Sequence, residues 1–116
     1  MKAAALFAAG IFALTSPAVW AQSAGPNDAQ IAAIVVTANQ VDIDAGKLAA
    51  SRSANKEVKE FAQRMVTDHT GVNKAATELV TKLKVKPQPN ATSKELKTAG
   101  DDTLKRLKAL KGAAFD

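Results

Sequence analysis

The stretch VKEFAQRMVTDHTGVNKAATELVTKL, residues 58–83, decides the fold. Its apolar residues and its single histidine recur in alternating steps of four and three, at Val58, Ala62, Met65, His69, Val72, Ala76, Leu79 and Leu83. That spacing places them on one side of an α-helix. The segment is therefore predicted to be a long amphipathic helix with His69 on the side that faces the rest of the protein.

The preceding segment has the same character. From Asp28 to about Arg52 the apolar residues again recur at helical spacing, at Ile31, Ile34, Val35, Ala38, Val41, Ala45 and Leu48. A short break, SRSAN, separates the two segments, and Ser53 or Asn55 can cap the second helix. Two long helices joined by so few residues are predicted to pack as an antiparallel hairpin.

A third, weaker helix is predicted after the proline-rich loop KPQPNAT, residues 86–92. It begins at Ser93, continues through Leu96, Leu104, Leu107 and Leu110, and is expected to be interrupted at Gly100 and the following Asp pair. No segment alternates in the manner of a strand. The predicted fold is all-α, an antiparallel helical hairpin plus a shorter third helix. Because one short helix cannot cover two long ones, we expect an incomplete helical bundle.

The N-terminal residues are typical of an export signal. Lys2 precedes an apolar run at residues 3–14, Pro17 follows, and small residues lead to a predicted cleavage point after Ala21. The run is short for a membrane span, although an uncleaved anchor is the alternative. The predicted organisation is a signal peptide at residues 1–21, a linker at 22–27 and one helical domain at 28–116. The predicted location is the periplasm, with outer-membrane association as a further option.

The composition limits the partners that the chain can have. The net charge is +5 and there is no cysteine, so disulfides and lipid attachment through cysteine are excluded. Basic residues are more frequent after residue 74 than before it, which allows weak contact with anionic lipid. The lysines are dispersed and are not interleaved with aromatic residues, so nucleic-acid binding is not expected. An ordinary solvated surface is the better interpretation of these charges.

Three stretches carry a resemblance to a known family. They are DIDAGKLA at residues 42–49, MVTDHT at residues 65–70 and GAAFD at residues 112–116. With the sequence between them, they resemble an uncharacterised family of secreted bacterial proteins, a domain of unknown function whose members are often labelled outer-membrane or periplasmic proteins. The resemblance implies a ferritin-like four-helix bundle.

The resemblance also implies two departures in this chain. Members of the family generally continue past the Phe-Asp pair with another long helix that carries its own histidine, so this chain resembles the N-terminal part of such a domain. Members also tend to have Glu where this chain has Asp42, which reaches one methylene less far. Both departures weaken the transfer of any site from the family.

The candidate site residues are Asp42, His69 and Asp68. A ferritin-like di-metal centre requires Glu-x-x-His motifs, and the residue three before His69 is Val66. Asp68 and His69 are adjacent, so they project about 100° apart on a helix and do not chelate one ion as an i, i+4 pair does. In a hairpin that turns near SRSAN, Asp42 and His69 should lie at similar height.

Two interpretations of this pair remain open. In the first, His69 donates to a carboxylate and the pair serves only to satisfy two polar groups between helices. In the second, Asp42, His69 and Asp68 are part of a site for a divalent metal such as zinc or iron, completed by ligands from another helix or a second chain. Under the first interpretation no cofactor is expected.

No enzyme class is indicated. The chain has no nucleophilic cysteine, no Gly-x-Ser-x-Gly motif and no glycine-rich phosphate loop. The leading hypothesis is a periplasmic structural or interaction module, linked by the family resemblance to envelope stress. A metal-binding bundle is the alternative. Uncovered apolar faces also predict a homo-oligomer.

Overall fold

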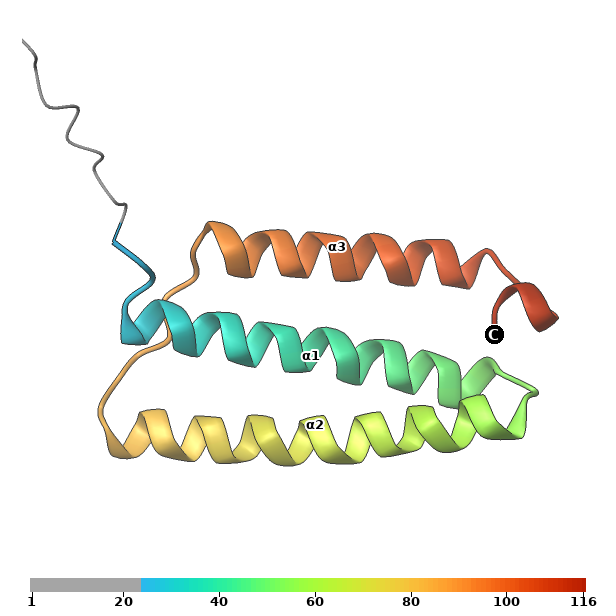
Figure 1. Ribbon diagram of the computed structural model, residues 1–116, viewed down its shortest axis with the longest axis horizontal. Helices are drawn as coiled ribbons and strands as arrows, with labels where there is room; N and C mark the ends of the chain where they lie inside the picture. The colour runs from blue at the N-terminus through green and yellow to red at the C-terminus, as the bar shows by residue number, and fades with distance from the viewer. Residues whose placement is uncertain (1–23) are drawn as a thin grey trace, which may run out of the picture.

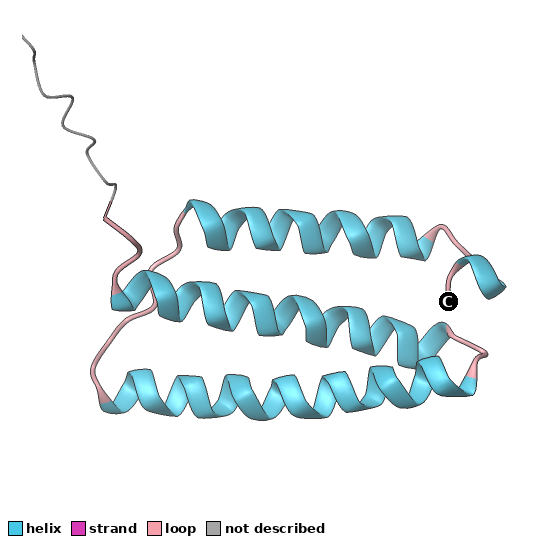
Figure 2. Cartoon of the chain, viewed as in Figure 1, coloured by secondary structure: helices cyan, strands magenta, loops and turns pink. Residues whose placement is uncertain are grey.

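The computed structural model describes residues 24–116. It contains helix α1 (Asp28–Arg52), helix α2 (Lys56–Lys82), helix α3 (Ala91–Lys108) and a short 3₁₀ turn, η1 (Gly112–Ala114). Within these residues no strand is present, and the predicted all-α class is confirmed (Figure 2). The predicted signal peptide, residues 1–21, lies outside the described residues.

The three helices form one layer with α1 in the middle (Figure 1). α1 packs against α2 on one side and α3 on the other, whereas α2 and α3 do not pack against each other. α1 and α2 are antiparallel, as predicted, because the connection between them is only three residues long. The arrangement matches the predicted incomplete bundle, since a closed three-helix bundle would bring α2 and α3 into contact.

Local sequence signals explain where each helix begins. The side chain of Asn55 accepts hydrogen bonds from the backbone N–H groups of Glu57 and Val58, so Asn55, one of the two predicted caps, starts α2. For α3 the prediction of Ser93 as the first residue was wrong. Asn90 is the cap, and Ser93 completes a capping box by accepting from the Asn90 backbone N–H at 2.9 Å.

The predicted interruption at Gly100 was also wrong, because α3 runs through it without a break. Gly100 is buried where α3 crosses α1, and a Cβ atom built there would lie 2.7 Å from Cγ2 of Val41. The absent side chain thus allows the two helices to approach closely. Gly46 has the same function between α1 and α2, where a Cβ would lie 3.0 Å from the carbonyl oxygen of Ala62.

The predicted buried stripes were only partly correct. Ile31 and Val35 of α1 and Val72, Leu79 and Leu83 of α2 are exposed. The most buried positions of α1 are instead Ala33, Asn39, Ile43 and Gly46, because α1 is clasped from two sides by α2 and α3. In a single layer, each helix covers only part of the apolar side of its neighbour. The other apolar residues of that side face solvent.

The C-terminal segment folds back onto the α1–α2 turn. The guanidinium group of Arg52 donates to the carbonyl oxygens of Lys108 and Leu110 at 3.0 and 2.9 Å. The same group lies 5.1 Å from the centre of the Phe115 ring. Ser53 Oγ donates to the carboxylate of Asp116. These contacts hold Phe115, which is 7% exposed, against the helices.

Candidate functional site

A small polar cluster lies between α1 and α2 at the middle of the hairpin. His69 Nδ1 is 2.7 Å from Oδ1 of Asn39, and Nδ2 of Asn39 donates to the carbonyl oxygen of Val35 at 3.0 Å. Because the Asn39 amide nitrogen is engaged with Val35, its oxygen faces the ring and accepts from it. The proton of neutral His69 is therefore on Nδ1.

This tautomer determines what His69 can do. With Nδ1 as the donor, Nε2 carries the lone pair, which is the form in which imidazole binds a metal or accepts a proton. A hydrogen bond from the other ring nitrogen to an oxygen is also the arrangement that orients histidine ligands in metal sites. The His69 side chain is 27% exposed, so it remains accessible.

Asp42 lies beside the ring, as predicted from its distance to the turn. Its Oδ2 atom is 3.7 Å from His69 Nδ1, and its side chain is 45% exposed. That separation is too long for a hydrogen bond, and Asn39 holds the Nδ1 proton instead. The carboxylate is thus a close neighbour of the His69 ring but not its hydrogen-bond partner.

Asp68 is not brought into this cluster. It is exposed, and within residues 24–116 its side chain forms no hydrogen bond or ion pair. Nor do any three His, Cys, Asp or Glu residues in this part of the chain gather closely enough to hold a metal ion. Of the three predicted ligands, the structure brings together Asp42 and His69.

Sequence reasoning missed two asparagines of the cluster. Asn39 is 8% exposed, and Asn73 donates from Nδ2 to the carbonyl oxygen of Val36 at 3.3 Å. Asn39 precedes Asp42 by three residues and Asn73 follows His69 by four, so each shares a helix face with a residue that had been singled out. Helical spacing from Asp42 and His69 was the signal that could have found them.

An apolar groove of about 320 Å³ begins at Asp42 and extends toward the C-terminal segment. It is formed by α1, α2, the last turn of α3 and the end of the chain, and its lining is Asp42, Ala45, Gly46, Ala49, Val58, Phe61, Ala62, Met65, Leu107, Phe115 and Asp116. Apolar side chains dominate the lining, and carboxylates occur only at Asp42 and Asp116. The groove suits an apolar occupant with a polar or basic end.

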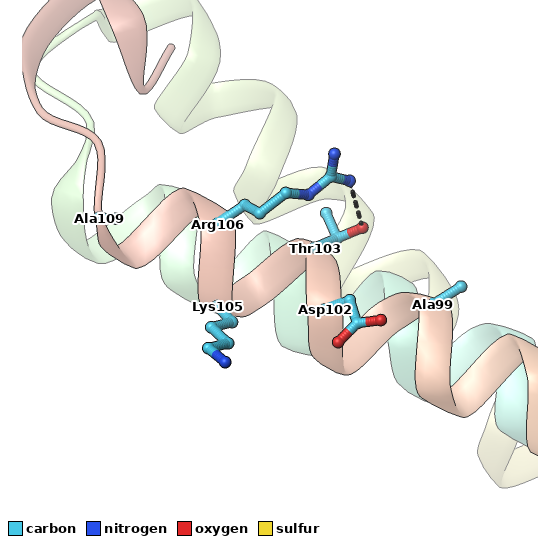
Figure 3. Close-up of a pocket in the computed structure, with 6 residues that line it drawn as sticks. All are labelled: Ala99, Asp102, Thr103, Lys105, Arg106 and Ala109. Carbon is cyan, nitrogen blue, oxygen red and sulfur yellow. Dashed lines mark hydrogen bonds between the residues drawn. The ribbon is translucent and has the colours of Figure 1, made fainter.

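The other hollows differ in character. On another side of the α1–α2 pair, a hollow is lined mainly by polar residues, among them Gln40, Thr70 and Lys74. A larger depression follows α3 alone, past Asp102, Lys105 and Arg106, where Arg106 donates to Thr103 Oγ1 at 3.4 Å (Figure 3). A depression formed by one helix is an exposed surface with no enclosing wall. The groove beside Asp42 is therefore the candidate binding site.

The fold and the site define an all-helical protein with a three-helix layer, one polar cluster and one apolar groove. Comparison of its sequence with family models identifies the family. The chain belongs to the family described as Domain of unknown function (DUF4142), which it matches over residues 14–116. No curated protein and no solved structure gives a significant match.

Among the described residues, none of the helices is both long enough and apolar enough to cross a bilayer.

Proposed function

We propose that the protein is an exported, ferritin-like helical module that acts in the cell envelope by binding another protein surface through one face of the α1–α2 hairpin. The single observation that supports this most strongly is the exposure of large apolar side chains on that hairpin. They are Ile31, Val35, Phe61, Val72, Leu79 and Leu83, between 39% and 64% exposed.

These side chains belong to one side of the layer. Asp42, Phe61 and Met65 line the same groove. Ile31 and Val35 lie on the helical line of Asp42, and Val72 and Leu79 follow Met65 at intervals of seven residues. A contiguous apolar surface of this kind on a water-soluble helix pair marks an interaction site, because its exposure to water is unfavourable.

Photo-cross-linking in the native host tests this proposal. A photoreactive residue at Leu79 should capture a partner, whereas the same residue at Thr77, on the polar side of α2, should not. Capture at neither position would contradict an interaction through this face. Export is tested separately by N-terminal sequencing of the protein from the periplasmic fraction, which should begin at Gln22.

A metal-binding function is the second candidate, with Asp42 and His69 as ligands and Asp68 as a more distant contributor. The observation that favours it is the orientation of His69, whose Nδ1 proton is held by Asn39 so that Nε2 is free to coordinate zinc or iron. Isothermal titration with Zn²⁺ should show binding that is lost in His69→Ala. Equal binding by the variant would exclude His69 as a ligand.

Weak contact with anionic lipid is a further proposal. Its support is the presence of several exposed basic residues on α3, among them Lys105 and Arg106, whose side chains leave different sides of the helix (Figure 3). Co-sedimentation with anionic vesicles at low ionic strength should detect it, and added salt should remove it.

A further inference from the structure

One stripe of α2 is both apolar and uncovered. Phe61, Met65, Asp68, Val72, Ala75 and Leu79 follow one another in steps of four and three, which is the spacing of a coiled-coil seam. Phe61, Val72 and Leu79 are 64%, 49% and 55% exposed. The helix contacts α1 through a different line, which includes the buried Ala62. The stripe is therefore available to a second helix.

We propose that the occupant of this stripe is a second copy of the chain, with the two α2 helices antiparallel and the two-fold axis beside Gly71. This inference rests on the proposed function, because it identifies the partner of the same apolar face. A two-fold interface requires a surface that is complementary to itself, and the order of residues along α2 meets this requirement.

The apolar residues match in one register. With the axis beside Gly71, Phe61 lies opposite Leu79 of the second copy and Met65 lies opposite its Ala75. Asp68, the one charged residue of the stripe, lies opposite Val72 near the axis. Sliding one α2 helix along the other by seven residues gives the alternative registers. In one direction Leu79 would lie opposite Asp68 of the second copy. In the other direction Leu79 would lie beyond the start of the second α2, with no residue opposite it.

The charges beside the stripe match in the same register. Arg64 and Glu78 occupy the outer flank, seven residues on either side of Gly71, so Arg64 of each copy lies opposite Glu78 of the other. Within residues 24–116 Arg64 forms no ion pair, and Glu78 has only an exposed 4.0 Å contact with Lys74. A parallel arrangement would instead bring the two Asp68 carboxylates together, which is unfavourable.

Gly71 fits the crossing point of the two helices. A Cβ atom built at Gly71 would meet nothing within 4 Å, so the close packing inside this chain does not require a glycine there. Glycine in the middle of a helix costs about 1 kcal/mol relative to alanine. A second helix that approaches closely at the two-fold axis would require a small residue at this position. The packing within one chain does not require it.

The available area is sufficient for a stable dimer. α1 and α2 present a face about 40 Å long and about 20 Å wide, on the order of 800 Å² from each copy. That is the area that each partner contributes to a standard protein–protein interface. Since the apolar line of α1 lies on the same side as the α2 stripe, two copies packed face to face cover both.

Cysteine cross-linking tests the proposed axis, because the chain has no cysteine of its own. Gly71→Cys should yield a disulfide-linked dimer under mild oxidation, since the two positions adjoin the axis. Thr77→Cys is the matched control, because Thr77 is exposed on the same helix but lies away from the stripe. Equal and slow cross-linking at both positions would overturn the proposal.

Charge reversal tests the register. Arg64→Glu should raise the dimer dissociation constant about tenfold by sedimentation equilibrium, and Glu78→Arg should do the same. The double variant restores both pairs and should return the constant to within about threefold of the original. Loss of dimer in both single variants without recovery in the double variant would exclude this register.

The two proposals fail in different ways. If Gly71→Cys does not cross-link and the purified protein sediments as a monomer, the second copy is excluded. Capture of a different protein by the photoreactive residue at Leu79 would then leave the proposed interaction function intact. A monomer with no capture at Leu79 would exclude both.

Discussion

The two seams of the layer, α1 against α3 and α1 against α2, are built differently although both contain a buried glycine. In the α1–α3 seam the side chain of Val41 packs against Gly100, and hydrogen bonds connect the two helices at both ends of the seam. Asn90 Nδ2 donates to the Gln30 carbonyl oxygen at one end, and Arg52 binds two carbonyls at the other. The α1–α2 seam has polar residues at its middle and an open apolar edge.

The difference indicates that the two seams have different functions. The α1–α3 seam is held by the packing of Val41 on Gly100 and by hydrogen bonds at its two ends. The α1–α2 seam contains His69, and the groove and the exposed stripe of α2 lie beside it. Substitutions in the first seam should therefore affect mainly stability, and those in the second should affect mainly binding.

The largest effect is expected for Gly100→Leu. A Cβ atom at this position would already lie 2.7 Å from Val41 Cγ2, and valine has little freedom about its first side-chain torsion. The helices must separate, and overpacking of this kind should lower the free energy of unfolding by about 3 kcal/mol. Urea denaturation followed by circular dichroism measures the loss.

The control for that substitution is Gly71→Ala. Within one copy Gly71 has nothing within 4 Å, so at protein concentrations low enough to keep the chain monomeric alanine should raise the stability by about 0.5–1 kcal/mol through its greater helix propensity. If both variants were destabilised equally, close packing at Gly100 would not be the reason that α3 has glycine there.

The next largest effect is expected for Arg52→Ala at the end of the α1–α3 seam. The variant loses two charge-assisted hydrogen bonds to carbonyl groups and the contact with the Phe115 ring. We expect a loss of about 1.5 kcal/mol, reduced from a fully buried case because Arg52 is exposed. Hydrogen exchange should show faster exchange confined to the C-terminal segment.

Arg52→Lys distinguishes the geometry of the guanidinium group from its charge. A lysine retains the charge but does not reproduce the planar fork that reaches both carbonyls. Its stability should fall between those of the original protein and Arg52→Ala. Full retention of stability would mean that charge alone holds the segment.

A smaller effect is expected for Asn39→Ala in the α1–α2 seam. The substitution leaves His69 Nδ1 without its acceptor and should lower stability by about 1 kcal/mol. It should also free the ring to adopt the other tautomer, which ¹⁵N chemical shifts of the imidazole report directly. An unchanged tautomer would show that Asp42 or water takes over the function of Asn39.

Much of the fold that produces the two seams could be predicted from the sequence, because helical periodicity and helix caps are local signals. The long helices, the Asn55 cap and the common height of Asp42 and His69 all follow from spacing along the chain. The exposure of Val72 and Leu79 could not be predicted in this way, because periodicity identifies an apolar side without showing which neighbour covers it. The function of Gly100 depends on Val41, which is distant in sequence and adjacent only in the folded layer.

The smallest effect is expected for a charge interaction between α1 and α3. The pKa of Lys97 is raised above its ordinary value, first by its hydrogen bond and charge interaction with Asp101 on the same helix and then, more weakly, by Asp44 of α1. A raised lysine pKa stabilises the folded state fully below the unfolded value of 10.5, and this stabilisation is lost as the pH rises through the folded value. Near pH 7 the contribution is therefore constant.

Because Lys97 is fully exposed, this pair should contribute almost nothing to the stability of the seam. Asp101→Asn should lower the Lys97 pKa measurably in an NMR titration, Asp44→Asn should lower it less, and neither should change the melting temperature at pH 7. A clear drop in melting temperature for Asp44→Asn would mean that charge, and not only the packing of Val41 on Gly100, joins α1 to α3. The contrast between a seam held by packing and a seam with a polar centre would then have to be revised.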